Sequence, residues 1–62
     1  MSEQHKLEMV TIFKDNIKFN EDLIAMCDKI LEVDSKADYY HNMKLEAQKN
    51  IYETKKRMVE YL

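Results

Sequence analysis

Apolar side chains recur with a helical period over residues 9–33, and this pattern constrains the fold more than any other feature. One seam, with spacings of three and four residues, consists of Val10, Phe13, Ile17, Asn20, Ile24, Cys27 and Leu31. Two series flank it at intervals of seven: Met9, Asn16, Leu23 and Ile30, and Ile12, Phe19, Met26 and Val33. At about 100° per residue, these positions fill an arc of roughly 160° on one amphipathic helix. A single partner helix covers only part of such an arc, so a second contact surface is expected.

The chain has 62 residues and contains neither Gly nor Pro. It therefore lacks the residues that usually form tight turns and break helices. This composition predicts an all-α protein with one small domain over residues 1–62. A chain of this length buries too little surface to be strongly stable alone. Its single Cys cannot form an internal disulfide, and one Cys with two distant His gives no zinc ligand set. Oligomerisation or docking on a partner is the remaining source of stability.

The apolar period breaks at residues 33–38, and this break predicts a turn between two helices. Asp34 or Ser35 suits a helix cap, and Ser35 with Asp38 approximates a capping box. The predicted helices cover about 3–33 and about 36–61, with the turn at about 34–36, in an antiparallel two-helix hairpin. A single bent helix is the alternative. Two hairpins packed face to face would cover the wide arc as a four-helix bundle.

The predicted interface within the hairpin and between two copies uses both helices. It consists of Val10, Phe13, Ile17, Asn20, Ile24, Cys27, Leu31, Ile12, Phe19, Met26, Tyr40, Ala47, Ile51 and Met58. Asn16 and Asn20 interrupt the apolar face one turn apart, and Asn50 and Thr54 are expected at the same level. A polar layer of this kind commonly fixes register and oligomeric state at a cost in stability. A binding role for the two asparagines is the alternative.

A second stripe on the helix predicted over 36–61 lies off its main seam and consists of Tyr39, Leu45, Tyr52 and Val59. Tyrosine is favoured where one end of the side chain is buried and the other hydrated, as at interfaces. These residues are expected either to pack against the first helix of a second copy or to form a docking surface for another protein.

Charges are mixed, with 10 basic and 12 acidic side chains, so no strong field directs the chain toward nucleic acid. The residues available for nucleic-acid binding are Lys55, Lys56 and Arg57. No Ser or Cys has a recognisable base partner, and no Gly-rich phosphate loop occurs. Asp38 and His41 have the spacing of half a di-metal motif, without the second motif and the further glutamates that such a site needs. We expect no enzyme activity, cofactor, metal or small-molecule substrate.

No targeting or membrane segment is expected. The N-terminus is polar and leads into no apolar segment of a signal peptide. The longest apolar run, Leu23 to Cys27, is far shorter than the ~20 residues of a membrane span. The lone thiol fits a reduced setting, and we expect a cytoplasmic location.

The turn sequence Asp34-Ser-Lys-Ala37-Asp38 is similar to the Asp-x-x-Ala-Asp turn of the Rop family, small plasmid regulators of RNA pairing. The chain also resembles that family in length, in its two helices and in the absence of proline. The resemblance implies a hairpin that dimerises into a four-helix bundle and, as an alternative function, binding of RNA or DNA. The family's RNA-contacting face uses polar and basic residues with a Phe along the first helix. Here the exterior of the first helix is largely acidic, which departs from that pattern.

The sequence as a whole predicts a small non-enzymatic protein that interacts with other proteins or regulates them through amphipathic helices. It is expected to act as a homodimer, with another protein as a further partner. In a close variant, the wide face of the first helix docks on a target in place of a second copy. A Rop-like RNA- or DNA-binding dimer is the alternative from a different class.

Overall fold

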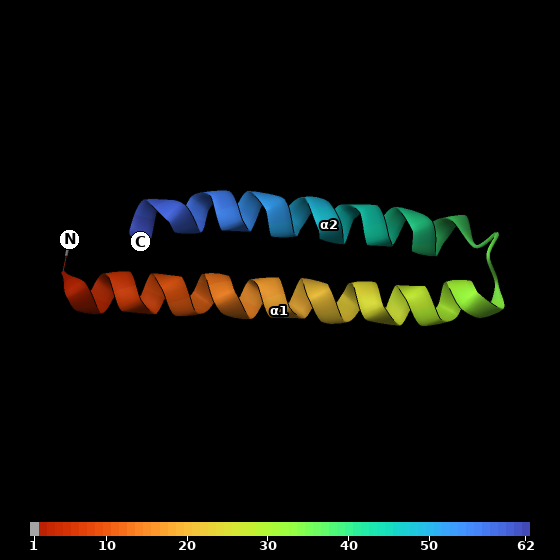
Figure 1. Cartoon of the computed structure of the whole chain (residues 1–62), viewed down its shortest axis with the longest axis horizontal. Helices are drawn as coiled ribbons and strands as arrows, with labels where there is room; N and C mark the ends of the chain where they lie inside the picture. Colours follow the sequence, from red (N-terminus) through yellow and green to blue (C-terminus); the bar gives the residue numbers. More distant parts are fainter. Residues whose placement is uncertain (1) are drawn as a thin grey trace.

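The computed structural model describes residues 2–62 and shows an antiparallel pair of helices (Figure 1). α1 spans Glu3–Val33, and α2 spans Asp38–Met58 and continues into a 3-10 turn, η1, at Val59–Tyr61. The two helices lie side by side, and the first and last described residues lie at the end away from the turn. The predicted all-α hairpin is confirmed, and the alternative of a single bent helix is wrong.

α1 begins at a capped end and continues without interruption for 31 residues. Ser2 Oγ accepts a hydrogen bond from the backbone N–H of His5 at 3.2 Å, and the acidic Glu3 lies in the first turn, where the helix dipole favours it. The helix ends at Asp34, whose backbone N–H donates to the carbonyl oxygen of Ile30 at 2.9 Å. Its length follows from the absence of helix-breaking residues.

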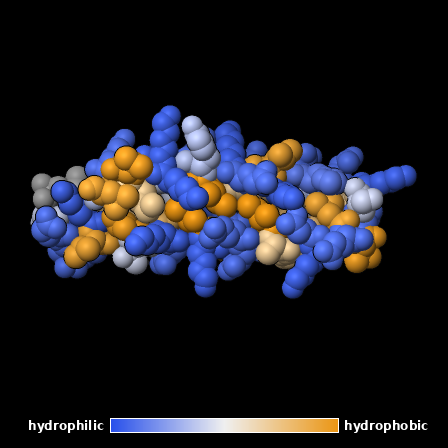
Figure 2. All heavy atoms as spheres, in the orientation of Figure 1, coloured by the Kyte–Doolittle hydropathy of each residue, from blue (hydrophilic) through white to orange (hydrophobic). Residues whose placement is uncertain are grey.

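The core is one line of contact between the two helices. Cys27 and Ala47 are the hydrophobic residues without exposed surface in the described chain, and the polar Asn20 is 3% exposed. The rest of the contact line is half-buried and consists of Val10, Phe13, Ile17, Ile24, Leu31, Tyr40, Ile51 and Met58. Figure 2 shows hydrophobic atoms between the helices and further hydrophobic patches that reach the outline of the molecule. The hairpin therefore has a thin core and leaves apolar surface uncovered.

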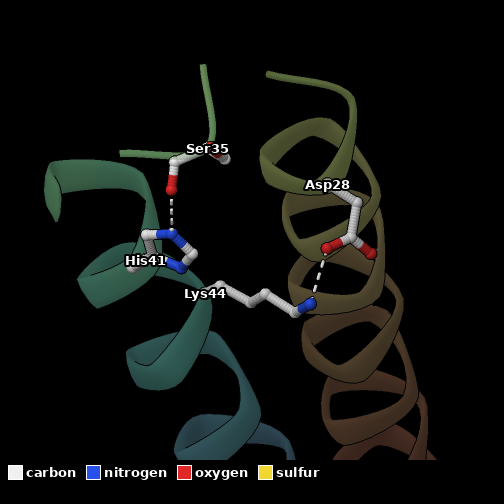
Figure 3. A network of polar contacts seen from close by, with 4 residues as sticks. All are labelled: Asp28, Ser35, His41 and Lys44. Atoms are coloured by element: carbon white, nitrogen blue, oxygen red, sulfur yellow. Dashed lines mark hydrogen bonds and ion pairs between the residues drawn. The ribbon is translucent and has the colours of Figure 1, made fainter. Parts of the chain in front are cut away.

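The turn differs from the expectation in where α2 begins. The helix starts at Asp38 rather than near residue 36, and its N-cap, Ala37, has no side-chain hydrogen bond. The expected capping box of Ser35 and Asp38 is therefore wrong. Instead, His41 Nε2 donates to the carbonyl oxygen of Ser35 at 2.8 Å (Figure 3). The Ala37 N–H donates to the carbonyl oxygen of Asp34 at 3.2 Å. These bonds hold the connection together without a glycine.

Side chains also link the helices near both ends of the hairpin. Near the turn, Lys44 Nζ lies 2.6 Å from Asp28 Oδ1 (Figure 3). Both side chains are partly exposed, so this ion pair contributes less than about 1 kcal/mol. At the other end, the ring of Tyr61 lies 5.5 Å from that of Phe13 and 6.4 Å from that of His5. These contacts fix the relative positions of the helices along their length.

Candidate interaction surfaces

Asn16 and Asn20 form a polar layer with α2 at the level expected from the sequence. Asn20 Nδ2 donates to the carbonyl oxygen of Asn16 at 2.9 Å and to Asn16 Oδ1 at 3.1 Å. Thr54 Oγ1 donates to the same Oδ1 at 3.0 Å, and Asn50 Nδ2 makes a longer bond, 3.5 Å, to Asn20 Oδ1. Among residues 2–62, no buried side-chain nitrogen or oxygen lacks a partner. The layer links the two helices of one chain in register.

Replacing Asn20 by leucine is expected to stabilise the hairpin by about 1 kcal/mol, a rise of a few degrees in Tm. A buried leucine gains more from burial than the replaced hydrogen bonds contribute, and the former partners Asn16 and Asn50 are exposed and can bond water. Thermal unfolding followed by circular dichroism at fixed protein concentration measures the change. Asn42→Leu, at an exposed position of α2 outside the polar layer, is the control and should leave Tm nearly unchanged. A clear fall in Tm for Asn20→Leu would contradict the hypothesis that Asn20 fixes the register of the helices at a cost in stability.

α1 carries a second line of apolar residues that α2 covers only in part: Met9, Leu23 and Ile30 are half-buried and the others are exposed. The two flanking series interleave at spacings of three and four residues to form this α1 seam: Met9, Ile12, Asn16, Phe19, Leu23, Met26, Ile30 and Val33. Phe19, near its middle, is 65% exposed. The predicted interface included only Ile12, Phe19 and Met26 of this set. The remaining residues of the α1 seam could have been found from their alternating spacing of three and four residues, which is typical of a separate helix–helix contact.

The exposed apolar stripe of α2 is shorter. The α2 stripe consists of Leu45 and Tyr52 on α2 and Val59 at the start of η1, which follow at intervals of seven and are 63%, 69% and 67% exposed. Tyr39, which was expected on the same surface, lies about 120° from Leu45 around the helix axis. Its ring packs edge-on against Tyr40, with ring centroids 5.1 Å apart. The expected four-residue surface is therefore divided, and Tyr39 belongs to another side of α2.

The α1 seam and the α2 stripe lie on opposite broad faces of the hairpin. One broad face is marked by a groove lined by Asn16, Asn50, Glu53, Thr54 and Arg57. Ile12 and Phe19 lie four residues before and three residues after Asn16, so the α1 seam follows this face. Tyr52 comes two residues after Asn50, about 160° away around the helix, so the α2 stripe faces the other side. A partner that covers the α1 seam leaves the α2 stripe accessible.

The residues expected for nucleic-acid binding do not form one patch. Lys55, Lys56 and Arg57 are all exposed, but successive residues of a helix lie about 100° apart. The three basic side chains therefore point toward different sides of α2. Arg57 lines the groove together with Glu53. This arrangement gives no single face on which all three side chains would contact a phosphate backbone.

The described part of the chain offers little for chemistry at a site. It holds no cluster of three His, Cys, Asp or Glu side chains suited to a metal ion, and Cys27 is a buried free thiol. None of its helices combines the length and the apolar character needed to cross a membrane. Comparison with protein-family models, curated proteins and solved structures finds no match to the chain. The two exposed apolar surfaces are therefore the basis for a functional proposal.

Proposed function

We propose that this protein is a small non-enzymatic interaction or regulatory protein that acts through amphipathic helices as a homodimer. The observation that supports the proposal is the α1 seam, whose central Phe19 remains 65% exposed in the hairpin. Regular exposed apolar positions along a long helix are typical of a helix–helix interface. A 62-residue hairpin with one thin contact line also gains stability from a second copy. The lone Cys27 suits a reducing compartment, and we assign the protein to the cytoplasm as part of this proposal.

A second copy fits the α1 seam when the two α1 helices run antiparallel. The layers then pair residues of different copies as follows: Met9 with Val33, Ile12 with Ile30, Asn16 with Met26, and Phe19 with Leu23. The twofold symmetry repeats every layer, so each seam position has a partner. Asn16 keeps its hydrogen bond from Thr54 in this arrangement.

Charges beside the α1 seam favour the same direction. Glu8, Asp15, Asp22 and Lys29 follow at intervals of seven along its outer edge, acidic first and basic last. In the antiparallel pair, Asp15 of each copy lies near Lys29 of the other. Asp22 of one copy lies near Asp22 of the other copy at the twofold axis. Solvent screens the repulsion between these two exposed side chains. In a parallel pair, the outer edges of the two α1 helices lie on opposite sides of the interface. Both contacts between Asp15 of one copy and Lys29 of the other are then lost.

α2 contributes a mostly polar edge to this interface. On the face that carries the α1 seam, the exposed residues of α2 include Tyr39, Glu46, Asn50, Glu53 and Arg57. The apolar contact is therefore made mainly by the two α1 helices, and the two α2 helices lie beside it. Together the four helices form the proposed four-helix bundle, with a dry α1 pair and a hydrated α2 edge.

Size-exclusion chromatography with light scattering tests the homodimer. At micromolar concentration the expected mass is twice the 7.5 kDa of one chain. A folded monomer at that concentration would refute the homodimer and favour the variant in which a target protein covers the α1 seam. The Rop-like alternative gains no support from the separated positions of Lys55, Lys56 and Arg57.

The same preparation reports the register of the dimer. In a Cys27→Ala background, Asp22→Cys places a thiol near its own copy in the antiparallel arrangement, whereas Thr11→Cys places it far from its copy. A short bismaleimide should therefore link Asp22→Cys chains in pairs and leave Thr11→Cys chains single. The reverse result would assign a different register.

A further inference from the structure

The α2 stripe remains uncovered in the proposed dimer because it lies on the opposite broad face. Leu45, Tyr52 and Val59 are each more than 60% exposed and extend over about 21 Å, or four turns of helix. Neither the hairpin nor the proposed dimer uses these side chains. Large apolar residues in a regular exposed row are typical of a surface that binds another helix.

The residues of α2 that lie next to Tyr52 in the α2 stripe are mostly basic. The helical neighbours of Tyr52, three and four residues away, are Gln48, Lys49, Lys55 and Lys56. The acidic residues between positions 39 and 62, which are Glu46, Glu53 and Glu60, follow at intervals of seven along another side of the helix, about 100° or more from the stripe. In contrast, Phe19 of the α1 seam has Asp15 and Asp22 as helical neighbours. The two apolar surfaces therefore differ in the sign of the adjacent charge.

We infer that the α2 stripe binds an acidic amphipathic helix of another protein. The inference rests on the proposed interaction function and specifies the chemistry of the partner. Apolar residues of the partner, at helical spacing, pack against Leu45, Tyr52 and Val59. Its Asp or Glu side chains lie near Lys49, Lys55 and Lys56. Such charge pairs set orientation and association rate more than affinity, while the apolar contact supplies most of the binding free energy.

Other occupants fit the α2 stripe less well. The phosphates of a nucleic acid would form ion pairs with the lysines but would leave the apolar side chains of the α2 stripe exposed to water. The α1 seam of a second copy has acidic neighbours, but it would join two different surfaces, and such a contact repeats from copy to copy into rings or filaments larger than a dimer. It would also compete with the twofold contact for the same seam. A separate acidic helix satisfies both the apolar row and the lysines.

Two designed helical peptides and the 62-residue chain test this inference. Both peptides carry leucines at helical spacing on one face, with flanking glutamates in the first and flanking lysines in the second. Fluorescence anisotropy at moderate salt should show binding of the acidic peptide that is tighter by about tenfold or more. This difference should shrink as salt rises. Equal affinities, preference for the basic peptide, or no binding of either would overturn the inference.

Variants assign the binding to one surface. Tyr52→Glu should abolish binding of the acidic peptide and keep the dimer mass, whereas Phe19→Glu should lose the dimer and still bind the peptide. These opposite results separate a failure of the inference from a failure of the proposed homodimer. Lys55→Glu combined with Lys56→Glu should reverse the preference toward the basic peptide, a result that a folding defect cannot produce. Circular dichroism confirms helix content in each variant.

The same samples show whether a nucleic acid or a second copy of the chain binds the α2 stripe instead. Oligouridine that binds in place of the acidic peptide would overturn the inference in favour of a nucleic acid. Species larger than a dimer that disappear in Tyr52→Glu would assign the α2 stripe to a second copy and likewise overturn it. A constant dimer mass over the concentration range, with oligouridine unbound, is the supporting result.

Discussion

Phe19→Glu is expected to convert the proposed dimer into a monomer, with a dissociation constant raised by about a hundredfold or more. Phe19 is 65% exposed in the hairpin, so its replacement leaves the contact between α1 and α2 intact. In the antiparallel dimer its ring packs against Leu23 of the second copy. A carboxylate at this position would be desolvated beside Asp15 and Asp22, which repel it. Light scattering over a concentration series measures the shift from dimer to monomer.

Ala25→Glu is the matched control for this substitution. Ala25 is exposed on the same helix and lies outside the α1 seam, so the same added charge should leave the dimer unchanged. A Phe19→Glu protein that stays dimeric would show that the α1 seam is not the interface. Helix content measured in parallel shows whether the separated hairpin remains folded.

The hairpin was predictable because its main signals are local and periodic. The apolar positions from Val10 to Leu31 that contact α2, together with the break at residues 33–38, predicted two helices and their antiparallel pairing. The structure confirms both. The level of the polar layer was also predictable, since folding at the turn brings Asn16 and Asn20 near Thr54 and Asn50. These features depend on spacing along the chain and need no knowledge of side-chain packing.

The details of the turn were not predictable in the same way. Asp34 and Ser35 both suit a cap, but a cap forms only where the backbone directs its side chain toward free N–H groups. Here α2 begins after Ala37, and the His41 ring bonds to the Ser35 carbonyl oxygen. Several polar residues compete at such a junction, and the backbone path decides among them.

The division of exposed apolar residues into two surfaces depends on tertiary packing. Three parallel series on α1 were available to meet α2, and the sequence alone does not say which remain uncovered. Close approach at Cys27 and Ala47, both fully buried, fixes the rotation of each helix about its axis. That rotation turns the α1 seam and Tyr52 to opposite faces, whereas the separation of Tyr39 from the α2 stripe follows from its spacing along the helix. One face then suits a second copy, and the other suits a different partner.

Ala47→Glu is expected to unfold the hairpin, because it introduces a charge at the point of closest packing. Ala47 has no exposed surface, and a carboxylate buried there without a partner costs about 3 kcal/mol or more. This cost is comparable to the whole stability that a core of this size supplies. Circular dichroism during heating should show little residual cooperative unfolding, while Ala25→Glu, the same change at an exposed helical position, should unfold near the wild-type Tm. A wild-type Tm for Ala47→Glu would contradict the close contact of α1 and α2 at this level, and with it the rotation that separates the two surfaces.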